Sequence, residues 1–321
     1  MSEASKSQQL LVDLGGTHVR FAQARDGSLG AIEKLVCADF ETFSAAIRFY
    51  LDKHPQAAPN EACIAIAAPL SGDQVVMTNS PWSFSLAEIQ QEFSFNQLHA
   101  LNDFEAIAYA VPHLKSDQLQ QVGGSSKVAD GNMVVLGSGT GLGVKHLSKC
   151  EEGWKVLMGE GGHVDFSPVD DVDLLLWQYW KSKQDHIATE DLLSGRGLLH
   201  IYRALCEYRE DEIRLENSVA IIHAGLESSC PLCVQTLAQF LRILGTFAGN
   251  LALNLNTTGG VYLCGGVITT LAPLLAKSDF RARFEAKGRF KPYVQNIPVY
   301  LITEPEPGLL GALKFLERNC G

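Results

Sequence analysis

The sequence predicts an α/β protein built from two related halves. Short apolar runs of strand length alternate with segments whose apolar residues recur at helical spacing, a pattern typical of α/β architecture with a mixed sheet. A strand, a glycine turn and a second strand occupy residues 9–24, and the same layout returns at 133–147. With 321 residues, the chain is long enough for a large core and two domains.

The composition is that of an ordinary globular protein, with 46% hydrophobic and 19% charged residues. A net charge of −10 argues against nucleic acid or an anionic membrane as the main partner, although a local glycine loop with Mg²⁺ can still bind ATP. The first nine residues are polar and no run of 18 apolar residues occurs, so we expect a cytoplasmic protein. Of eight cysteines, only Cys230 and Cys233 form a C-x-x-C pair, and with no second pair to complete a zinc site we expect reduced thiols.

Strands and helices are expected to alternate through the first half. The predicted strands cover residues 9–14, 19–24, 62–67, 75–78 and 98–101. Phe43, Ala46 and Ile47 begin an amphipathic pattern that predicts a helix to residue 51. Ser85 and Glu88 have the spacing of a capping box, and a further helix should run from Phe104 to just before Pro112.

The second half follows a polar, glycine-containing link at 116–131 and is more helical. Its predicted helices cover residues 172–183, 198–207, 233–253, 268–276 and 308–317, and strands are expected at 260–263 and 299–302. The first of these helices carries Trp177, Tyr179 and Trp180. Core or subunit-interface packing is the expected role of such an aromatic set, and from it we expect a homodimer.

The stretch M-V-V-L-G-S-G-T-G-L-G at 133–143 is a candidate phosphate-binding turn. A short buried strand leads into glycines 137, 139, 141 and 143, and backbone N–H groups of such a turn can cradle an anion. A plain tight turn between two strands is the alternative. Leu142 breaks the dinucleotide-binding spacing G-x-G-x-x-G, and no G-K-[ST] follows for a Walker A loop, so neither familiar template applies.

The corresponding turn in the first half carries a carboxylate. Asp13 ends a strand just before Gly15, Gly16 and Thr17, where it could hold Mg²⁺ through water beside a phosphate chain. An Asx turn is the alternative. When the two turns are aligned on their threonines, Leu136 stands where Asp13 stood, so we expect the two turns to do different jobs.

Other polar side chains follow predicted strands or lie in loops. Asn102 and Asp103 end a strand, where ligands collect in α/β sheets, although either residue also suits the N-cap of the next helix. Glu160 and His163 lie three apart in a glycine-rich loop that suits polyol hydroxyls, with a metal site as the alternative. Glu190 is a further loop carboxylate that could equally be solvated.

In their order and spacing, the motifs of this chain resemble those of bacterial glucokinases, members of the hexokinase and actin-like ATPase superfamily. The resemblance covers essentially the whole length and rests on V-D-L-G-G-T at 12–17, I-A-A-P-L-S-G-D at 66–73, M-T-N-S-P-W-S-F-S at 77–85, L-N-D-F at 101–104, G-S-G-T-G-L-G at 137–143, G-E-G-G-H-V-D-F at 159–166, E-D-L-L-S-G at 190–195, N-L-A-L-N-L at 250–255 and G-G-V at 265–267. His18, Ser138 and Arg196 stand where the family commonly has asparagine, alanine and proline.

The resemblance implies two ribonuclease H-like α/β domains flanking a cleft. The small domain would span residues 1–113, with the C-terminal helix 305–321 returning to it, and the large domain would span 114–304. The implied reaction is in-line transfer of phosphate from ATP to the 6-hydroxyl of D-glucose. Asp103 would be the general base and Asn102 would bind neighbouring hydroxyls, while Glu160, His163 and Glu190 would bind the 1-, 2- and 3-hydroxyls.

The resemblance also assigns a nucleotide site that uses Mg²⁺. Asp13 would hold the metal through water or phosphate. Gly265 and Gly266 would form part of the adenosine wall. The two phosphate turns would consist of Val12, Asp13, Leu14, Gly15, Gly16, Thr17, Gly137, Gly139, Thr140 and Gly141.

The sequence leaves several related interpretations of the function open. The acceptor could be another hexose or an amino sugar, and the donor could be ADP or polyphosphate. A non-catalytic sugar-sensing regulator on the same fold would need a DNA-binding segment before the first strand, where only nine residues lie. An actin- or chaperone-like ATPase would not explain Glu160 and His163 in one glycine loop.

Overall fold

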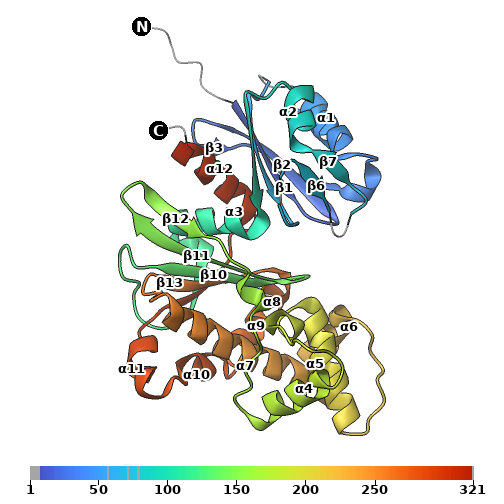
Figure 1. The fold of residues 1–321 in the computed structure, drawn as a ribbon, viewed down its shortest axis with the longest axis vertical. Coiled ribbons are helices and arrows are strands. Elements are labelled where there is room, and N and C mark those ends of the chain that lie inside the picture. Colours follow the sequence, from blue (N-terminus) through green and yellow to red (C-terminus); the bar gives the residue numbers. More distant parts are fainter. Residues whose placement is uncertain (1–7, 56–57, 71, 78–79, 320–321) are drawn as a thin grey trace. The chain divides into compact units, whose positions relative to one another are not determined.

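The computed structural model describes residues 8–55, 58–70, 72–77 and 80–319 (Figure 1). The chain divides into two compact units. Unit 1 comprises Met1–Leu114 and Glu304–Gly321, and unit 2 comprises Lys115–Thr303. Each unit contains a mixed sheet with helices, as the alternation of strand and helix patterns predicts.

The sheet of unit 1 has the order β3-β2-β1-β5-β8, with β4 also paired to β2. β1 is antiparallel to β2 and parallel to β5, which in turn is parallel to β8. A separate two-stranded ribbon joins β6 and β7. The bounds are β1 Gln8–Leu14, β2 His18–Arg25, β3 Ser28–Leu29, β4 Glu33–Val36, β5 Glu61–Ile66, β6 Gln74–Val76, β7 Ser83–Ser85 and β8 Gln97–Asn102.

Two hydrophobic cores cover the two faces of this sheet. Leu10, Val12 and Leu14 of β1 belong to the core that α1 (Phe43–Lys53) covers. Leu11 belongs to the opposite core, which contains residues of α3 (Asp103–Ala110) and of α12 (Pro307–Asn319). α12 packs against α3 within the unit (Figure 1). Because side chains alternate along a strand, Asp13 shares the face of Leu11 and so lies on the side of α3 and α12.

The sheet of unit 2 repeats this arrangement in the order β12-β11-β10-β13-β14-β9. β10 is antiparallel to β11 and parallel to β13, as β1 is to β2 and β5. The predicted repeat of two related halves is therefore confirmed. The bounds are β9 Leu119–Gly123, β10 Met133–Ser138, β11 Leu142–Cys150, β12 Gly153–Leu157, β13 Gly260–Cys264 and β14 Val299–Ile302.

One large core joins the sheet of unit 2 to its helices. The longest helix, α7, is the one helix among the described residues that is long and apolar enough to cross a membrane, but 78% of its most apolar window is buried inside the protein. It is therefore a core helix. The bounds are α4 Asp171–Lys181, α5 Gly195–Tyr208, α6 Ser218–Leu226, α7 Pro231–Asn254, α8 Gly266–Thr270, α9 Ala272–Leu275, α10 Phe280–Glu285 and α11 Lys291–Val294.

Some predicted boundaries were wrong for identifiable reasons. The link at 116–131 contains β9, a short edge strand whose sequence L-Q-Q-V-G lacks strong apolar alternation. The helix predicted at 268–276 is divided into α8 and α9, with Pro273 in the first turn of the second. α5 begins at Gly195 rather than 198, because the Ser194 side chain caps it by accepting a hydrogen bond from Gly197 N–H. The predicted strand end at Thr78 lies outside the described residues.

The aromatic helix α4 packs into its own unit. Trp177, Tyr179 and Trp180 are partly buried against the large core, and the Trp180 ring lies 4.0 Å from the His200 ring, centroid to centroid. The core-packing interpretation of this helix is therefore confirmed, and because these side chains are only partly buried, the subunit interface stays a prediction.

Candidate active site

In unit 1, the β1–β2 hairpin places a cation opposite Asp13. The antiparallel register pairs Asp13 with Arg20, and Arg20 Nη1 lies 3.3 Å from Asp13 Oδ2. Arg20 Nε lies 2.7 Å from Glu306 Oε2, just before α12 begins. Neither Arg20 nor Glu306 is among the predicted site residues, because this ion-pair group depends on strand register and on the return of the C-terminal segment.

The environment of Asp13 makes its carboxyl a weaker acid than an ordinary aspartate. Burial raises the pKa of Asp13 to about 6, and the negative charges of Asp103 and Glu306 act in the same direction against the lowering effect of Arg20. A divalent cation beside this carboxylate would favour the ionised form instead. Mg²⁺ prefers hard oxygen ligands, and Asp13 offers a carboxylate oxygen next to a glycine turn. Asp13 therefore fits a Mg²⁺ ion that is bound to a phosphate chain.

Asn102 and Asp103 lie where β8 passes into α3. The parallel registers align Asn102 with Ile66 and Ile66 with Leu14, so this junction and Asp13 lie at the same edge of the sheet. Asn102 Oδ1 accepts a hydrogen bond from Phe104 N–H at 3.2 Å, so Asn102 is the N-cap of α3. Asn102 Nδ2 and Phe104 N–H both donate to Asp103 Oδ1 at 2.9 Å. The cap therefore also orients the Asp103 carboxylate.

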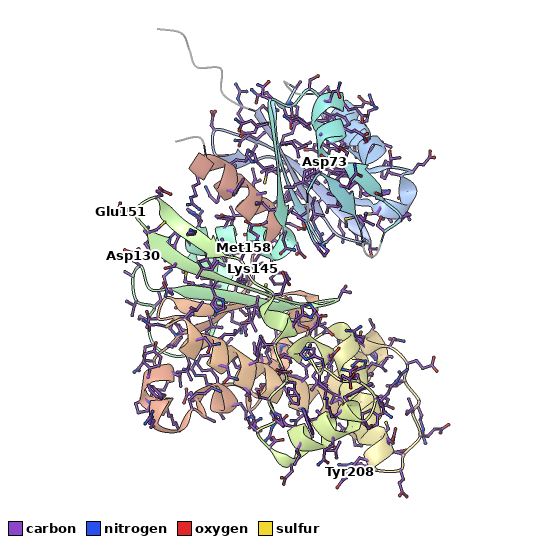
Figure 2. The ribbon with its side chains drawn as sticks, in the orientation of Figure 1. Asp73, Asp130, Lys145, Glu151, Met158 and Tyr208 are labelled. Atoms are coloured by element: carbon purple, nitrogen blue, oxygen red, sulfur yellow. The ribbon has the colours of Figure 1, made fainter. Side chains whose placement is uncertain are left out.

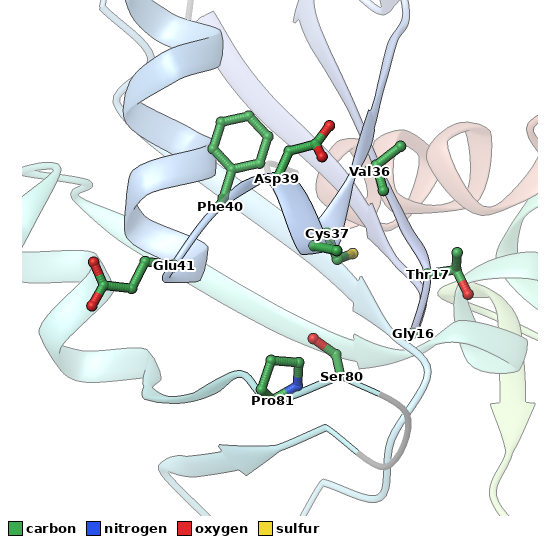
Figure 3. Close-up of a pocket in the computed structure, with 10 residues that line it drawn as sticks. Gly16, Thr17, Val36, Cys37, Asp39, Phe40, Glu41, Ser80 and Pro81 are labelled. Atoms are coloured by element: carbon green, nitrogen blue, oxygen red, sulfur yellow. The ribbon is translucent and has the colours of Figure 1, made fainter.

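The first glycine turn borders a cavity of about 560 Å³ (Figure 3). The turn is closed by a hydrogen bond from Gly15 N–H to His18 O at 3.0 Å. Gly16 and Thr17 line one side of the cavity, and residues 36–41 and 80–81 line the rest. Asp39 and Glu41 give the lining an acidic character, so of these surfaces the turn itself suits an anion best.

In unit 2, the second glycine turn forms hydrogen bonds with residues that are distant from it in the sequence. Gly139 N–H donates to Gly141 O at 2.9 Å, and Gly195 N–H donates to Gly139 O at 2.8 Å. Glu190 Oε2 accepts from Leu142 N–H at 2.8 Å, and the Glu190 side chain is only 19% exposed. The solvated-loop interpretation of Glu190 was wrong, because its carboxylate supports this turn.

Gly265, one of the two predicted adenosine-wall residues, lies against the same turn. Gly265 has a φ of +90°, and a Cβ there would lie 2.4 Å from Ser138 O, so only glycine fits. Gly266 begins α8 directly afterwards. Ser138 Oγ is buried and has no hydrogen-bond partner in the part of the chain that the structure describes.

Glu160 and His163 project from the segment that follows β12. The glycine-rich loop contains a single 3₁₀ turn at Gly161–His163. The Glu160 side chain is 80% exposed, and His163 is also exposed. A Cβ on Gly162 would lie 2.2 Å from Leu142 O, so this segment lies directly on the start of β11. The segment that carries Glu160 and His163 thus contacts Leu142 through Gly162, and Glu190 contacts Leu142 through its N–H group.

A second cavity, of about 660 Å³, borders this segment. Gly161, Val164 and Thr189 line it on one side, and residues of α7 line it on the other. The cavity touches neighbours of the three predicted sugar ligands rather than the ligands themselves, so it is distinct from the surface that Glu160 and His163 present.

Comparison with known proteins places this geometry in a family. A family model described as Glucokinase matches residues 10–319. The chain belongs to the glucokinase family. A glucokinase from Klebsiella pneumoniae is 42% identical over 317 residues, which cover 97% of this chain and 98% of the relative.

Solved structures of glucokinases share the fold. A glucokinase from an Antarctic psychrotroph is 34% identical, with a TM-score of 0.88 over 97% of this chain and 99% of that one. A glucokinase from Balamuthia mandrillaris, solved in complex with glucose, is 24% identical, with a TM-score of 0.78 over 100% and 96% of the two chains. The predicted fold class, the two-domain α/β fold of the actin-like ATPases, is confirmed by this likeness.

Proposed function

We propose that this member of the glucokinase family transfers the γ-phosphoryl group of ATP to the 6-hydroxyl of D-glucose, giving glucose 6-phosphate. The observation that carries the proposal is the junction of β8 and α3, where hydrogen bonds from neighbouring residues orient the Asp103 carboxylate. Asp103 Oδ1 accepts two hydrogen bonds at 2.9 Å, which fix its position at the sheet edge it shares with Asp13. An oriented carboxylate at this edge suits proton acceptance from a sugar hydroxyl.

Asp103 would act as the general base and Asn102 would bind a neighbouring hydroxyl. Phosphoryl transfer requires little covalent work from the protein, so positioning carries much of the rate enhancement. In unit 2, Glu160, His163 and Glu190 would bind the 1-, 2- and 3-hydroxyls. A sugar that lacks or inverts one of these hydroxyls would leave a polar group unpaired, which penalises binding.

The nucleotide would bind through the glycine turns described above for each unit. In unit 1, Val12–Thr17 would hold phosphate oxygens, and Asp13 would hold Mg²⁺ through water or phosphate. In unit 2, Gly137–Gly141 would bind phosphate, and Gly265 and Gly266 would contact adenosine. Mg²⁺ would neutralise charge on the phosphates when bound. Glu190 and Gly195 keep the second turn in shape through their hydrogen bonds.

The test of this function is a coupled phosphorylation assay on a panel of hexoses and amino sugars. We expect glucose with ATP to give the highest kcat/KM, with ADP and polyphosphate inactive as donors. A higher kcat/KM for another sugar would reassign the acceptor. Glucose binding without turnover would instead favour a sugar-sensing regulator.

Substitution of Gly162 is expected to impair the sugar-binding segment. In Gly162→Ala, the new Cβ cannot occupy a position 2.2 Å from Leu142 O, so the segment with Glu160 and His163 must shift. A displacement of about 1 Å in a binding group can cost about 10²-fold, and we expect kcat/KM for glucose to fall by about that factor. Gly159→Ala is the matched control, because a Cβ on Gly159 meets no atom within 4 Å. Equal kcat/KM values for the two variants would contradict the assignment of Glu160 and His163 as sugar ligands.

We also propose that the protein is a cytoplasmic homodimer. The described cysteines are all free thiols, which suits a reducing compartment. The homodimer is proposed from the aromatic residues of α4, which are only partly buried against the core of unit 2. Light scattering coupled to size-exclusion chromatography measures the oligomeric state directly.

A further inference from the structure

A buried lysine lies behind the proposed sugar-binding segment. Lys145, in the middle of β11, is only 4% exposed. Its neighbour Val144 belongs to the helix-covered core, so alternation turns Lys145 toward the opposite face of the sheet. Figure 2 places Lys145 beside Met158, the residue that follows β12. No motif in the sequence singles this lysine out.

The segment after β12 continues along β11 toward the second glycine turn. Leu157, the last residue of β12, pairs with His146. The next residues contact β11 progressively closer to its start. Gly159 O accepts a hydrogen bond from Lys145 Nζ at 2.8 Å. A Cβ on Gly161 would lie 3.0 Å from Val144 Cβ, and a Cβ on Gly162 would lie 2.2 Å from Leu142 O. The sugar-binding segment is therefore laid on β11, and Lys145 makes the one charged contact of this series.

Lys145 also approaches the carboxylate that would bind sugar. Its Nζ lies 3.5 Å from Glu160 Oε1, at the long end of the hydrogen-bond range. An ammonium group buried this far needs partners to offset its lost hydration. The Glu160 carboxylate is 80% exposed and keeps most of its own hydration, so Lys145 directs it at little desolvation cost.

We propose that Lys145 is a positioning residue for glucose binding: it fixes the Gly159 carbonyl and holds the Glu160 carboxylate in the orientation that accepts sugar hydroxyl hydrogen bonds. The inference rests on the proposed role of Glu160 as a sugar ligand. Because Lys145 would act through Glu160, its removal should weaken sugar binding while the chemical step and the nucleotide site remain intact.

The test is Lys145→Met, which keeps an unbranched side chain one atom shorter than lysine and removes its charge. Loss of a charge-assisted hydrogen bond corresponds to about 10–100-fold, and we expect KM for glucose to rise by that factor. We expect kcat and KM for ATP to change by less than about 3-fold, on the order of the scatter in single-contact effects. Lys145→Arg, which keeps the charge, should recover most of the glucose affinity. Lys149→Met is the matched control, since Lys149 lies on the same strand and is 42% exposed.

A double-mutant cycle with Glu160→Gln separates positioning from general stabilisation of the segment. If Lys145 acts through Glu160, Lys145→Met should add less than about 3-fold to KM in the Glu160→Gln background. Fully multiplicative effects, or an unchanged KM in Lys145→Met, would overturn the inference. If urea denaturation shows that Lys145→Met does not fold, Lys145→Gln replaces it in the same double-mutant cycle with the same criteria. Its side-chain amide retains a hydrogen-bond donor for Gly159 O.

Failure of this inference is distinguishable from failure of the proposed function. A wild-type protein that does not phosphorylate glucose contradicts the function itself. A wild-type protein that does so, with Lys145→Met indistinguishable from Lys149→Met, contradicts only the role of Lys145.

Discussion

Replacing Asp103 with asparagine is expected to lower kcat for glucose by about 10²–10⁴-fold, the range for loss of a positioned general base. The asparagine amide oxygen can accept the hydrogen bonds that Asn102 Nδ2 and Phe104 N–H give to Asp103 Oδ1, so the local geometry should persist. Proton acceptance is lost together with the negative charge of the carboxylate. Steady-state kinetics with glucose and ATP measure kcat, and calorimetry measures glucose binding, which should change little.

Glu105→Gln provides the matched control for this variant. Glu105 lies in the first turn of the same helix and its replacement removes the same charge. We expect its kcat to stay within about 3-fold of wild type, because a charge that touches no reacting atom contributes little to the transition state. An Asp103→Asn enzyme with a kcat near the wild-type value would contradict the assignment of Asp103 as the base.

Replacing Asp173 with alanine is expected to lower the free energy of unfolding of unit 2 by about 3–5 kcal/mol, because removing one partner of a buried ion pair leaves the other charge uncompensated. Asp173 is 1% exposed and accepts hydrogen bonds from Arg283 Nη2 and Gln239 Nε2, each at 2.6 Å. Its loss leaves the Arg283 guanidinium, 13% exposed, with only Asp170 as a carboxylate partner in the described ion pairs. These contacts join α4 to α7 and α10.

Urea denaturation monitored by tryptophan fluorescence measures this effect, because Trp177 and Trp180 lie on the same helix as Asp173. Asp171→Ala is the control: it removes an exposed carboxylate from the same helical turn and should cost less than about 1 kcal/mol. A loss below about 1 kcal/mol in Asp173→Ala would show that the buried pair contributes no more than a surface charge.

The sequence was sufficient to predict the features that depend on local pattern. Both strand–glycine–strand hairpins were predicted because apolar runs end in glycine, and the structure confirms them at β1–β2 and β10–β11. Asn102 was predicted at a strand end with a capping alternative. The structure shows that the cap and the orientation of Asp103 are one arrangement, since the capping amide also donates to Asp103.

The contacts that shape the candidate site could not be predicted from local pattern, because they join distant segments. The pairing of Arg20 with Glu306 spans almost the entire chain. Glu190 reaches Leu142 N–H across 48 residues, and nothing near position 190 indicates this. Lys145 resembles an ordinary polar residue in a strand, and its burial becomes visible only once the segment after β12 is seen to follow β11.

Identification of the product is the decisive test of phosphorylation at the 6-hydroxyl of glucose. Phosphorus NMR of the product formed from glucose and ATP distinguishes the position of the ester, because phosphate on the 6-oxygen couples to the two protons of the adjacent CH₂ group. We predict a single new sugar monophosphate with this coupling pattern, together with ADP in equal amount. A sugar phosphate esterified at another oxygen, or ADP formed together with free phosphate and no sugar ester, would show that the protein does not transfer phosphate to the 6-hydroxyl.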